Sequence, residues 1–281
     1  MKYNKISGFS DEIAKDIKTQ FEVLNKLGIK YFEPRGINGN NISRLSDEEV
    51  QELLLDMKKW GITPSSIGSF VGKIYIDEDF EPHFEMFKRT VEIAKRLGTK
   101  YIRMFSFYNH DVWNDETRAE VFRRLHALLD YAKENDIVLL HENEKDIYGE
   151  KVTECLDIMK EFYCDNFKAV FDPANFVQAG QDTKEAYQML KPYIAYMHIK
   201  DALSNGDVVP AGMGEGNLAY ILGDLLGNGF DGYISLEPHL GSFEGLADLE
   251  LDDKMLKLEK GGELTFTVAY DALEKIIDDI L

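Results

Sequence analysis

Four short apolar segments in the second half of this chain each end in an acidic residue or a histidine. Each segment is rich in Val, Ile, Phe or Tyr, as buried strands are, and a loop and then a helical pattern follow it. The segments are residues 138–144, 167–173, 194–201 and 232–238. Because the strands of a parallel barrel all end at one rim, we expect the polar residues that close these segments to meet there.

The first half of the chain continues the same alternation of strand-like and helical segments. Further strands are expected at residues 6–9, 31–34, 64–70 and 101–107. Helices are expected at residues 15–27, 46–60, 80–97, 115–135, 151–162, 183–190, 218–226 and 268–280. Eight strand–helix units predict a parallel sheet closed into a (β/α)8 barrel, the TIM barrel, and we assign residues 1–281 to this single domain.

A Rossmann-like open sheet is the alternative to a closed barrel. It would need a Gly-rich phosphate loop after the first strand, and Gly8–Phe9–Ser10–Asp11 is not such a loop. The acidic segment 240–262 lies between the eighth strand and the last helix. This position predicts a lid over the rim.

Charge and composition exclude several classes of protein. The net charge of −19 makes nucleic acid an unsuitable general partner. The chain has no apolar run near the ~20 residues that span a bilayer, and it begins with polar residues rather than a secretory signal. Cys155 and Cys164 lack a CxxC spacing and are typical of reduced cysteines. We therefore expect a cytoplasmic protein that binds neither membrane nor nucleic acid, and the sequence leaves a homo-oligomer open.

The residues that close the four segments suggest a metal site. Side chains alternate across a strand, so Glu142, His198 and Glu237 can all point into the barrel mouth. Ionised carboxylates in such a place are costly unless they are paired or bound to a cation. The strand ends carry no equal set of basic residues, and Arg103 and Lys200 are the only close candidates. A divalent ion is the more economical explanation. Any one of these acids could instead cap a helix or lie at the surface, and for Asp172, which precedes a proline, a turn role is the main rival.

The chain resembles the xylose isomerase-like TIM barrels, a family of sugar and sugar-phosphate isomerases and epimerases. The resemblance covers the whole chain and is most specific in five motifs: Leu140–His141–Glu142–Asn143, Phe171–Asp172–Pro173–Ala174–Asn175, Met197–His198–Ile199–Lys200–Asp201, Gly214–Glu215–Gly216–Asn217 and Ser235–Leu236–Glu237–Pro238–His239. It implies that Glu142, Asp172, His198 and Glu237 are the metal ligands. It also implies one Mn²⁺, Mg²⁺, Co²⁺ or Zn²⁺ ion, and the oxygen-rich ligands favour Mn²⁺ or Mg²⁺.

Some positions depart from particular members of the family. Ketose 3-epimerases carry a Glu, a His and an Arg where this chain has Tyr148, Asn175 and Ser204, so epimerisation of free ketohexoses is not expected. The histidines with which DNA-repair endonucleases of the superfamily bind three zinc ions are not present either. For the substrate we expect contacts with Asn175, Arg103, Lys200 and Lys145.

The predicted chemistry is proton abstraction next to a carbonyl, in carbohydrate metabolism. Glu142 and Glu237 would exchange protons with a sugar or sugar phosphate, and a metal-bound enediolate would be isomerised or epimerised. Two alternatives use the same site: a lyase or dehydratase acting on an oxo-sugar or 3-oxo-glycoside, and a sugar-binding barrel without catalysis.

Overall fold

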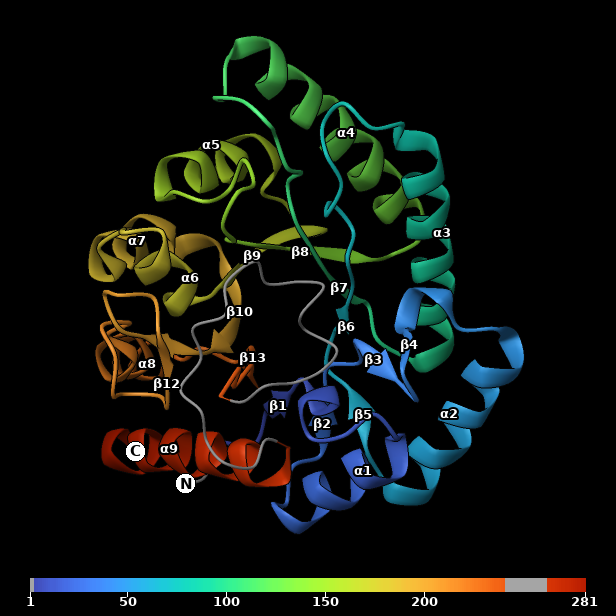
Figure 1. Cartoon of the computed structure of the whole chain (residues 1–281), viewed down its shortest axis with the longest axis vertical. Coiled ribbons are helices and arrows are strands. Elements are labelled where there is room, and N and C mark those ends of the chain that lie inside the picture. The colour runs from blue at the N-terminus through green and yellow to red at the C-terminus, as the bar shows by residue number, and fades with distance from the viewer. Residues whose placement is uncertain (1–2, 241–261) are drawn as a thin grey trace.

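The computed structural model describes residues 3–240 and 262–281, which form the predicted (β/α)8 barrel (Figure 1). The barrel strands are β1 (Ile6–Gly8), β2 (Tyr31–Phe32), β5 (Thr63–Pro64), β6 (Ile67–Gly68), β7 (Tyr101–Met104), β8 (Val138–Glu142), β9 (Phe167–Phe171), β10 (Ile194–Ile199) and β13 (Tyr233–Leu236). Short antiparallel pairs lie outside this ring, β3 (Gly36–Ile37) with β4 (Asn40–Asn41) and β11 (Asp201–Ala202) with β12 (Val208–Val209).

Two sets of parallel strands close the barrel. Seven strands form one sheet in the order β1-β13-β10-β9-β8-β7-β6, while β2 pairs with β5. Backbone hydrogen bonds join the sets, since the N–H of Glu33 donates to the carbonyl of Gly8 (2.8 Å) and that of Gly68 to the carbonyl of Pro34 (2.9 Å). The ring therefore closes just beyond β2, which excludes the open-sheet alternative.

Helices surround the strands (Figure 1). They are α1 (Ile17–Lys26), α2 (Asp47–Trp60), α3 (Phe80–Leu97), α4 (Asp115–Glu134), α5 (Val152–Phe162), α6 (Pro173–Gln178), α7 (Thr183–Leu190), α8 (Leu218–Gly227) and α9 (Glu263–Ile280). The start of α2 shows how local chemistry fixes a boundary. The N–H of Glu49 donates to Ser46 Oγ (3.2 Å), and the N–H of Ser46 donates to Glu49 Oε2 (2.7 Å). Each side chain therefore accepts a backbone N–H that has no partner within the helix.

Three expectations need correction or fall outside the structure. The single strand expected at 64–70 is two short strands, because the chain pairs with β2 before Ser65 and with β7 after Ser66. The helix α6 was not predicted, and α9 begins at Glu263 rather than at residue 268. The lid expected at 240–262 falls almost entirely on residues 241–261, which lie outside the described residues.

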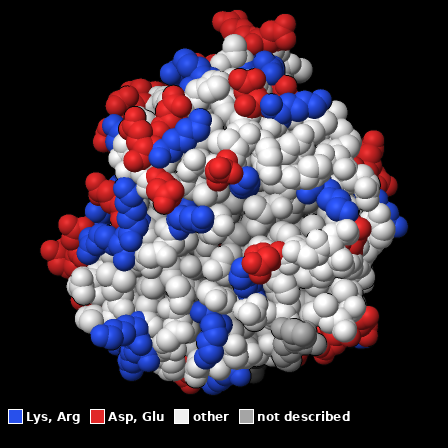
Figure 2. Space-filling model, turned by 180° about the vertical axis from the view of Figure 1, so that it is seen from behind, with Lys and Arg blue, Asp and Glu red and all other residues white. Residues whose placement is uncertain are grey.

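The barrel interior changes character along its axis. The layer nearer the starts of the strands is apolar, with Val138, Leu140, Val170 and Tyr196 packed together. Polar side chains fill the other end, where the strands finish. The face opposite to that of Figure 1 carries Lys and Arg interspersed with Asp and Glu around a largely uncharged middle (Figure 2). Within the described residues, no helix is long and apolar enough to cross a membrane.

Candidate metal centre

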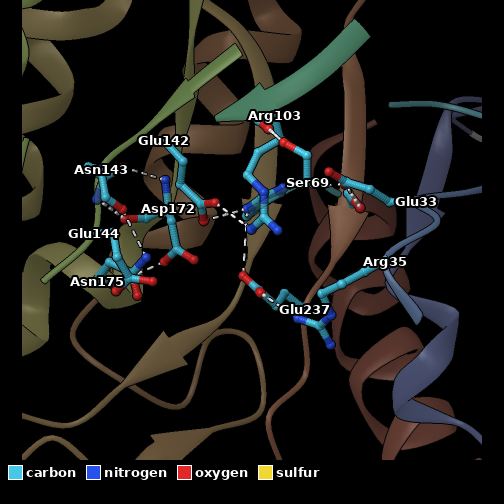
Figure 3. A network of polar contacts seen from close by, with 12 residues as sticks. Glu33, Arg35, Ser69, Arg103, Glu142, Asn143, Glu144, Asp172, Asn175 and Glu237 are labelled. Atoms are coloured by element: carbon cyan, nitrogen blue, oxygen red, sulfur yellow. Dashed lines mark hydrogen bonds and ion pairs between the residues drawn. The ribbon is translucent and has the colours of Figure 1, made fainter. Parts of the chain in front are cut away.

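Four polar side chains meet where β8, β9, β10 and β13 end. Glu142 is the last residue of β8, Asp172 follows β9, His198 lies near the end of β10 and Glu237 follows β13. All four are buried, and one ligand atom from each lies within 4.8 Å of the others. Figure 3 shows Glu142, Asp172 and Glu237 directed toward a common space. The structure thus brings the four residues together, and their role as metal ligands stays a prediction.

Hydrogen bonds hold both the backbone and the side chain of Asp172. Its N–H donates to Asn143 Oδ1 (3.0 Å), and Asn143 Nδ2 donates back to its carbonyl (2.9 Å). Its Oδ1 accepts the N–H of Asn175 (3.0 Å) and caps α6, while its Oδ2 lies 3.2 Å from Lys200 Nζ. The turn role considered from the sequence is therefore real, and it leaves the second oxygen facing the centre.

His198 presents its two ring nitrogens to different carboxylates. Nδ1 lies 2.7 Å from Glu142 Oε1 and 3.6 Å from Glu237 Oε2. Nε2 lies 3.3 Å from Glu33 Oε2, which also accepts the hydroxyls of Tyr196 (2.8 Å) and Ser235 (2.7 Å). Burial opposes the charged imidazolium, but Glu142 and Glu33 raise the pKa of His198 well above its usual value.

Two buried cations border the centre. Arg103 Nη1 donates to Glu142 Oε2 (2.8 Å), and its guanidinium lies 4.6 Å from the centroid of the Phe105 ring. Lys200 Nζ lies between Asp172 Oδ2 (3.2 Å) and Glu237 Oε2 (3.5 Å). Arg103 and Lys200 thus lie beside the four residues, and contact with a substrate stays a prediction for both.

The three carboxyl groups respond differently to this surrounding. Burial raises the pKa of each, and for Asp172 it prevails over the attraction of Lys200, so that its pKa is about 7. For Glu142, His198 and Arg103 outweigh burial and lower the pKa to about 2. For Glu237, Lys200 and His239 outweigh it as well, and its pKa falls well below the usual value. The two glutamates are therefore carboxylates at neutral pH, while Asp172 is about half protonated there.

Asn175 and Lys145, the other two residues expected to contact substrate, make no ion pair with the four candidate ligands in the described structure. Asn175 is buried at the start of α6, and its Nδ2 donates to the carbonyl of Asn143 (2.9 Å). Lys145 is half-buried in the loop after β8, where its backbone N–H donates to the Glu144 carboxylate (2.9 Å). Its ammonium forms no ion pair with any of the four candidate ligands in the part of the chain that the structure describes. Contact with a substrate remains a prediction for both.

The sequence reasoning missed a second buried polar group beside the centre. Arg35 lies among the carboxylates of Asp11, Glu12 and Glu237, and His239 Nε2 lies 3.3 Å from Glu12 Oε1. Burial opposes charge on His239, but Glu12 and Glu237 raise its pKa to about 10. Their position in the sequence could have identified them, because they too follow the ends of strands. Asp11 and Glu12 follow β1, and Arg35 follows β2.

The centre fits a divalent cation. Asp172 Oδ2 and Glu237 Oε2 are buried and make no hydrogen bond within the described residues, although the Lys200 ammonium lies near both, so each oxygen has lone pairs available to a cation. Three carboxylates and one imidazole nitrogen are donors that Mg²⁺, Mn²⁺ and Zn²⁺ accept.

Fold and site together define a TIM barrel with an acidic, histidine-containing centre at the C-terminal ends of its strands. The chain belongs to the xylose isomerase-like TIM barrel family, whose model matches residues 21–257.

Relatives within this fold differ in activity. A 3-dehydroshikimate dehydratase of Bacillus anthracis is 21% identical over 178 residues, and the match spans 63% of this chain and 63% of that enzyme. The IOLI protein, solved with a bound zinc atom, has a TM-score of 0.76 at 19% identity, over 99% of both chains. An L-ribulose 3-epimerase has a TM-score of 0.75 at 15% identity, over 98% of this chain and 94% of that one. At such identities the two structures show the fold alone.

Proposed function

We propose that this protein is a divalent-metal-dependent enzyme that removes a proton next to a carbonyl group of a sugar or sugar phosphate and thereby isomerises or epimerises it. The observation that carries the proposal is the meeting of two buried, ionised glutamates, Glu142 and Glu237, with Asp172 and His198. Buried acids with displaced pKa values in one place are a mark of proton chemistry.

Glu142, Asp172, His198 and Glu237 would hold the ion, and Mn²⁺ or Mg²⁺ is proposed because three of the four ligands are oxygen donors. When bound, a divalent ion supplies Lewis acidity that polarises a carbonyl oxygen. The protein of the same fold that was solved with a bound zinc atom supports a divalent ion here.

The two glutamates differ in how their oxygens are held. Glu142 uses Oε2 for Arg103 and Oε1 for His198, whereas Glu237 directs Oε1 at Arg35 and leaves Oε2 without a hydrogen bond in the described structure. An ionised carboxylate oxygen has two lone pairs, so Oε2 can face the ion with one and take a proton with the other. Glu237 is thus the residue better placed to take the α-proton, and Glu142 the one to return it. Because both carboxyl groups have low pKa values and are weak bases, the substrate C–H must be brought within about 3 Å of the oxygen.

The buried cations would stabilise the negative charge that develops when the proton leaves. Arg103 and Lys200 are fixed by ion pairs and need no rearrangement during the reaction. Both carry charge at neutral pH, because their neighbouring carboxylates outweigh burial and raise the pKa of each.

A lyase is the second candidate, and the dehydratase relative favours it. Loss of a β-hydroxyl begins with the same C–H cleavage, so the two candidates share Glu237 and Arg103 and differ in what leaves afterwards. A panel of ketoses, sugar phosphates and cyclic oxo-acids, incubated in D₂O with Mn²⁺, Mg²⁺, Co²⁺ or Zn²⁺, separates them by NMR.

Deuterium in the recovered sugar or its isomer is the expected result, and an unsaturated product would identify the lyase. Glu237→Gln should reduce turnover about 10²–10⁴-fold, as loss of a general acid–base does. Glu161→Gln, the same change on the exposed surface of α5, is the matched control. An absence of turnover across the panel by protein that binds the ion would contradict the proposal and favour a non-catalytic sugar-binding barrel.

A further inference from the structure

A second acidic cluster lies directly beside the candidate metal centre. Glu12, Glu237 and His239 each offer a ligand atom within 4.8 Å of the others, and Asp11 lies next to them in the short helix η1 (Ser10–Glu12). All four side chains are buried. The cluster therefore holds enough donors to attract a cation of its own.

Glu237 belongs to both the metal centre and the second cluster. Its Oε2 lies 3.6 Å from His198 Nδ1 and 3.5 Å from Lys200 Nζ, on the side of the metal centre. Its Oε1 lies 3.2 Å from Arg35 Nη1 and 3.4 Å from His239 Nε2, on the side of the second cluster. A carboxylate divided in this way has the arrangement of a bridging ligand in a site for two metal ions.

The guanidinium of Arg35 already occupies the second position. Nε lies 2.8 Å from Asp11 Oδ2, Nη1 lies 3.2 Å from Glu237 Oε1 and Nη2 lies 3.4 Å from Glu12 Oε1, so each nitrogen faces a different carboxylate. The group is buried and packs over the Phe9 ring at 4.5 Å (Figure 3 shows its approach to Glu237). Because a guanidinium keeps its charge in proteins, this positive charge is permanent.

We propose that Arg35 is a built-in cation that takes the place of a second metal ion beside Glu237, so that the centre binds one divalent ion and Glu237 offers it Oε2. The proposal rests on the metal site of the proposed function and is independent of turnover. It assigns Arg35 as a positioning residue that fixes both the number of ions and the orientation of the shared carboxylate.

Metal stoichiometry tests the proposal directly. Chelator-treated protein is titrated with Mn²⁺ by calorimetry, and bound Mn²⁺ is measured by elemental analysis after desalting. The wild-type chain is expected to bind one ion. Arg35→Met, which removes the charge and keeps an extended side chain, should bind a second and weaker ion, whereas Arg35→Lys should still bind one. Adding Glu12→Gln to Arg35→Met should abolish the second ion.

Some results would overturn the inference. Two ions in the wild-type chain would show that Arg35 does not exclude the second one, and so would a folded Arg35→Met protein that binds only one. Arg35→Gln, which keeps a donor for Asp11, provides the neutral variant if Arg35→Met does not fold by circular dichroism. Failure of the wild type to bind any ion would contradict the proposed function as well, whereas one bound ion without turnover would contradict the proposed function alone.

Discussion

The carboxylate of Glu33, next to the His198 ring, allows a direct test of the candidate metal centre. Glu33 is buried, and its Oε2 lies 3.3 Å from His198 Nε2, on the far side of the ring from Glu142. A histidine that binds a metal through one nitrogen commonly donates its other N–H to a carboxylate, which fixes the ring and makes it a stronger ligand. We therefore expect Glu33→Gln to weaken metal binding although Glu33 lies outside the four candidate ligands.

The expected size of the effect follows from the geometry. Coulomb's law gives about 5 kcal/mol for unit charges 3.3 Å apart at an effective dielectric constant of about 20, which is an upper limit because the buried carboxylate has lost its hydration. Changes of this kind reduce metal affinity about 10–100-fold, or about 1.4–2.7 kcal/mol. Gln keeps the shape of Glu33 and can still accept the hydroxyls of Tyr196 and Ser235, so the charge is the main quantity removed.

Calorimetric titration of the metal-free protein with Mn²⁺ measures this effect. Ser235→Ala is the control, because it removes one hydrogen bond to the same carboxylate and leaves its charge in place. Its Mn²⁺ affinity should fall much less than that of Glu33→Gln. If Glu33→Gln keeps the wild-type melting temperature and binds Mn²⁺ within threefold of the wild type, the proposed support of His198 by Glu33 is wrong.

Two further predictions concern stability. Asp201 is buried, and its carboxylate accepts hydrogen bonds of 2.8–3.0 Å from the backbone N–H groups of Ala202, Gly212, Gly214 and Gly216. Asp201→Ala should lower the free energy of unfolding, measured by urea denaturation, by about 3 kcal/mol or more, because each buried donor left without an acceptor costs about 1–3 kcal/mol. A loss below 1 kcal/mol would mean that water replaces the carboxylate. Ser46→Ala removes the cap of α2 and should cost about 1 kcal/mol without changing metal affinity, and an unchanged urea midpoint would contradict that role.

The sequence predicted the barrel because its strands are apolar and regularly spaced, and it pointed to the rim because polar residues interrupt those strands at their ends. The same rule was not applied to the first two strands, where Glu33 and Arg35 flank a proline and resemble the start of an ordinary turn. These residues become part of the site only through closure of the barrel, which pairs β1 with β13 and joins the end of β2 to β1. Sequence spacing does not report that contact.

The short helix α6 shows a different limit. A helix of six residues has too few internal hydrogen bonds to be stable on its own, and it depends on tertiary contacts. Asp172 adds local support by capping the helix with Oδ1. One residue therefore serves both the backbone and the centre, and the sequence presented these roles as competing interpretations.

Proton release on metal binding provides a final prediction from the charges of the centre. In the metal-free protein two of the proposed ligands hold protons: Asp172, whose pKa burial raises to about 7, and His198, whose pKa neighbouring carboxylates raise well above its usual value. Both folded-state values lie above the unfolded ones, so the stability that these protons contribute is lost as pH rises, and a bound cation would restore it.

Because ligands must be deprotonated to bind a metal, each ion should displace about two protons at pH 6 and about one at pH 8, where Asp172 is already ionised. Mn²⁺ affinity should accordingly increase with pH over this range. Calorimetry in buffers of different ionisation enthalpy measures the number of protons released, and Asp172→Asn should bring the value at pH 6 to about one, since His198 alone then loses a proton. Binding without proton release at pH 6 would show that Asp172 and His198 are not both ligands, and the proposed set of four metal ligands would be wrong.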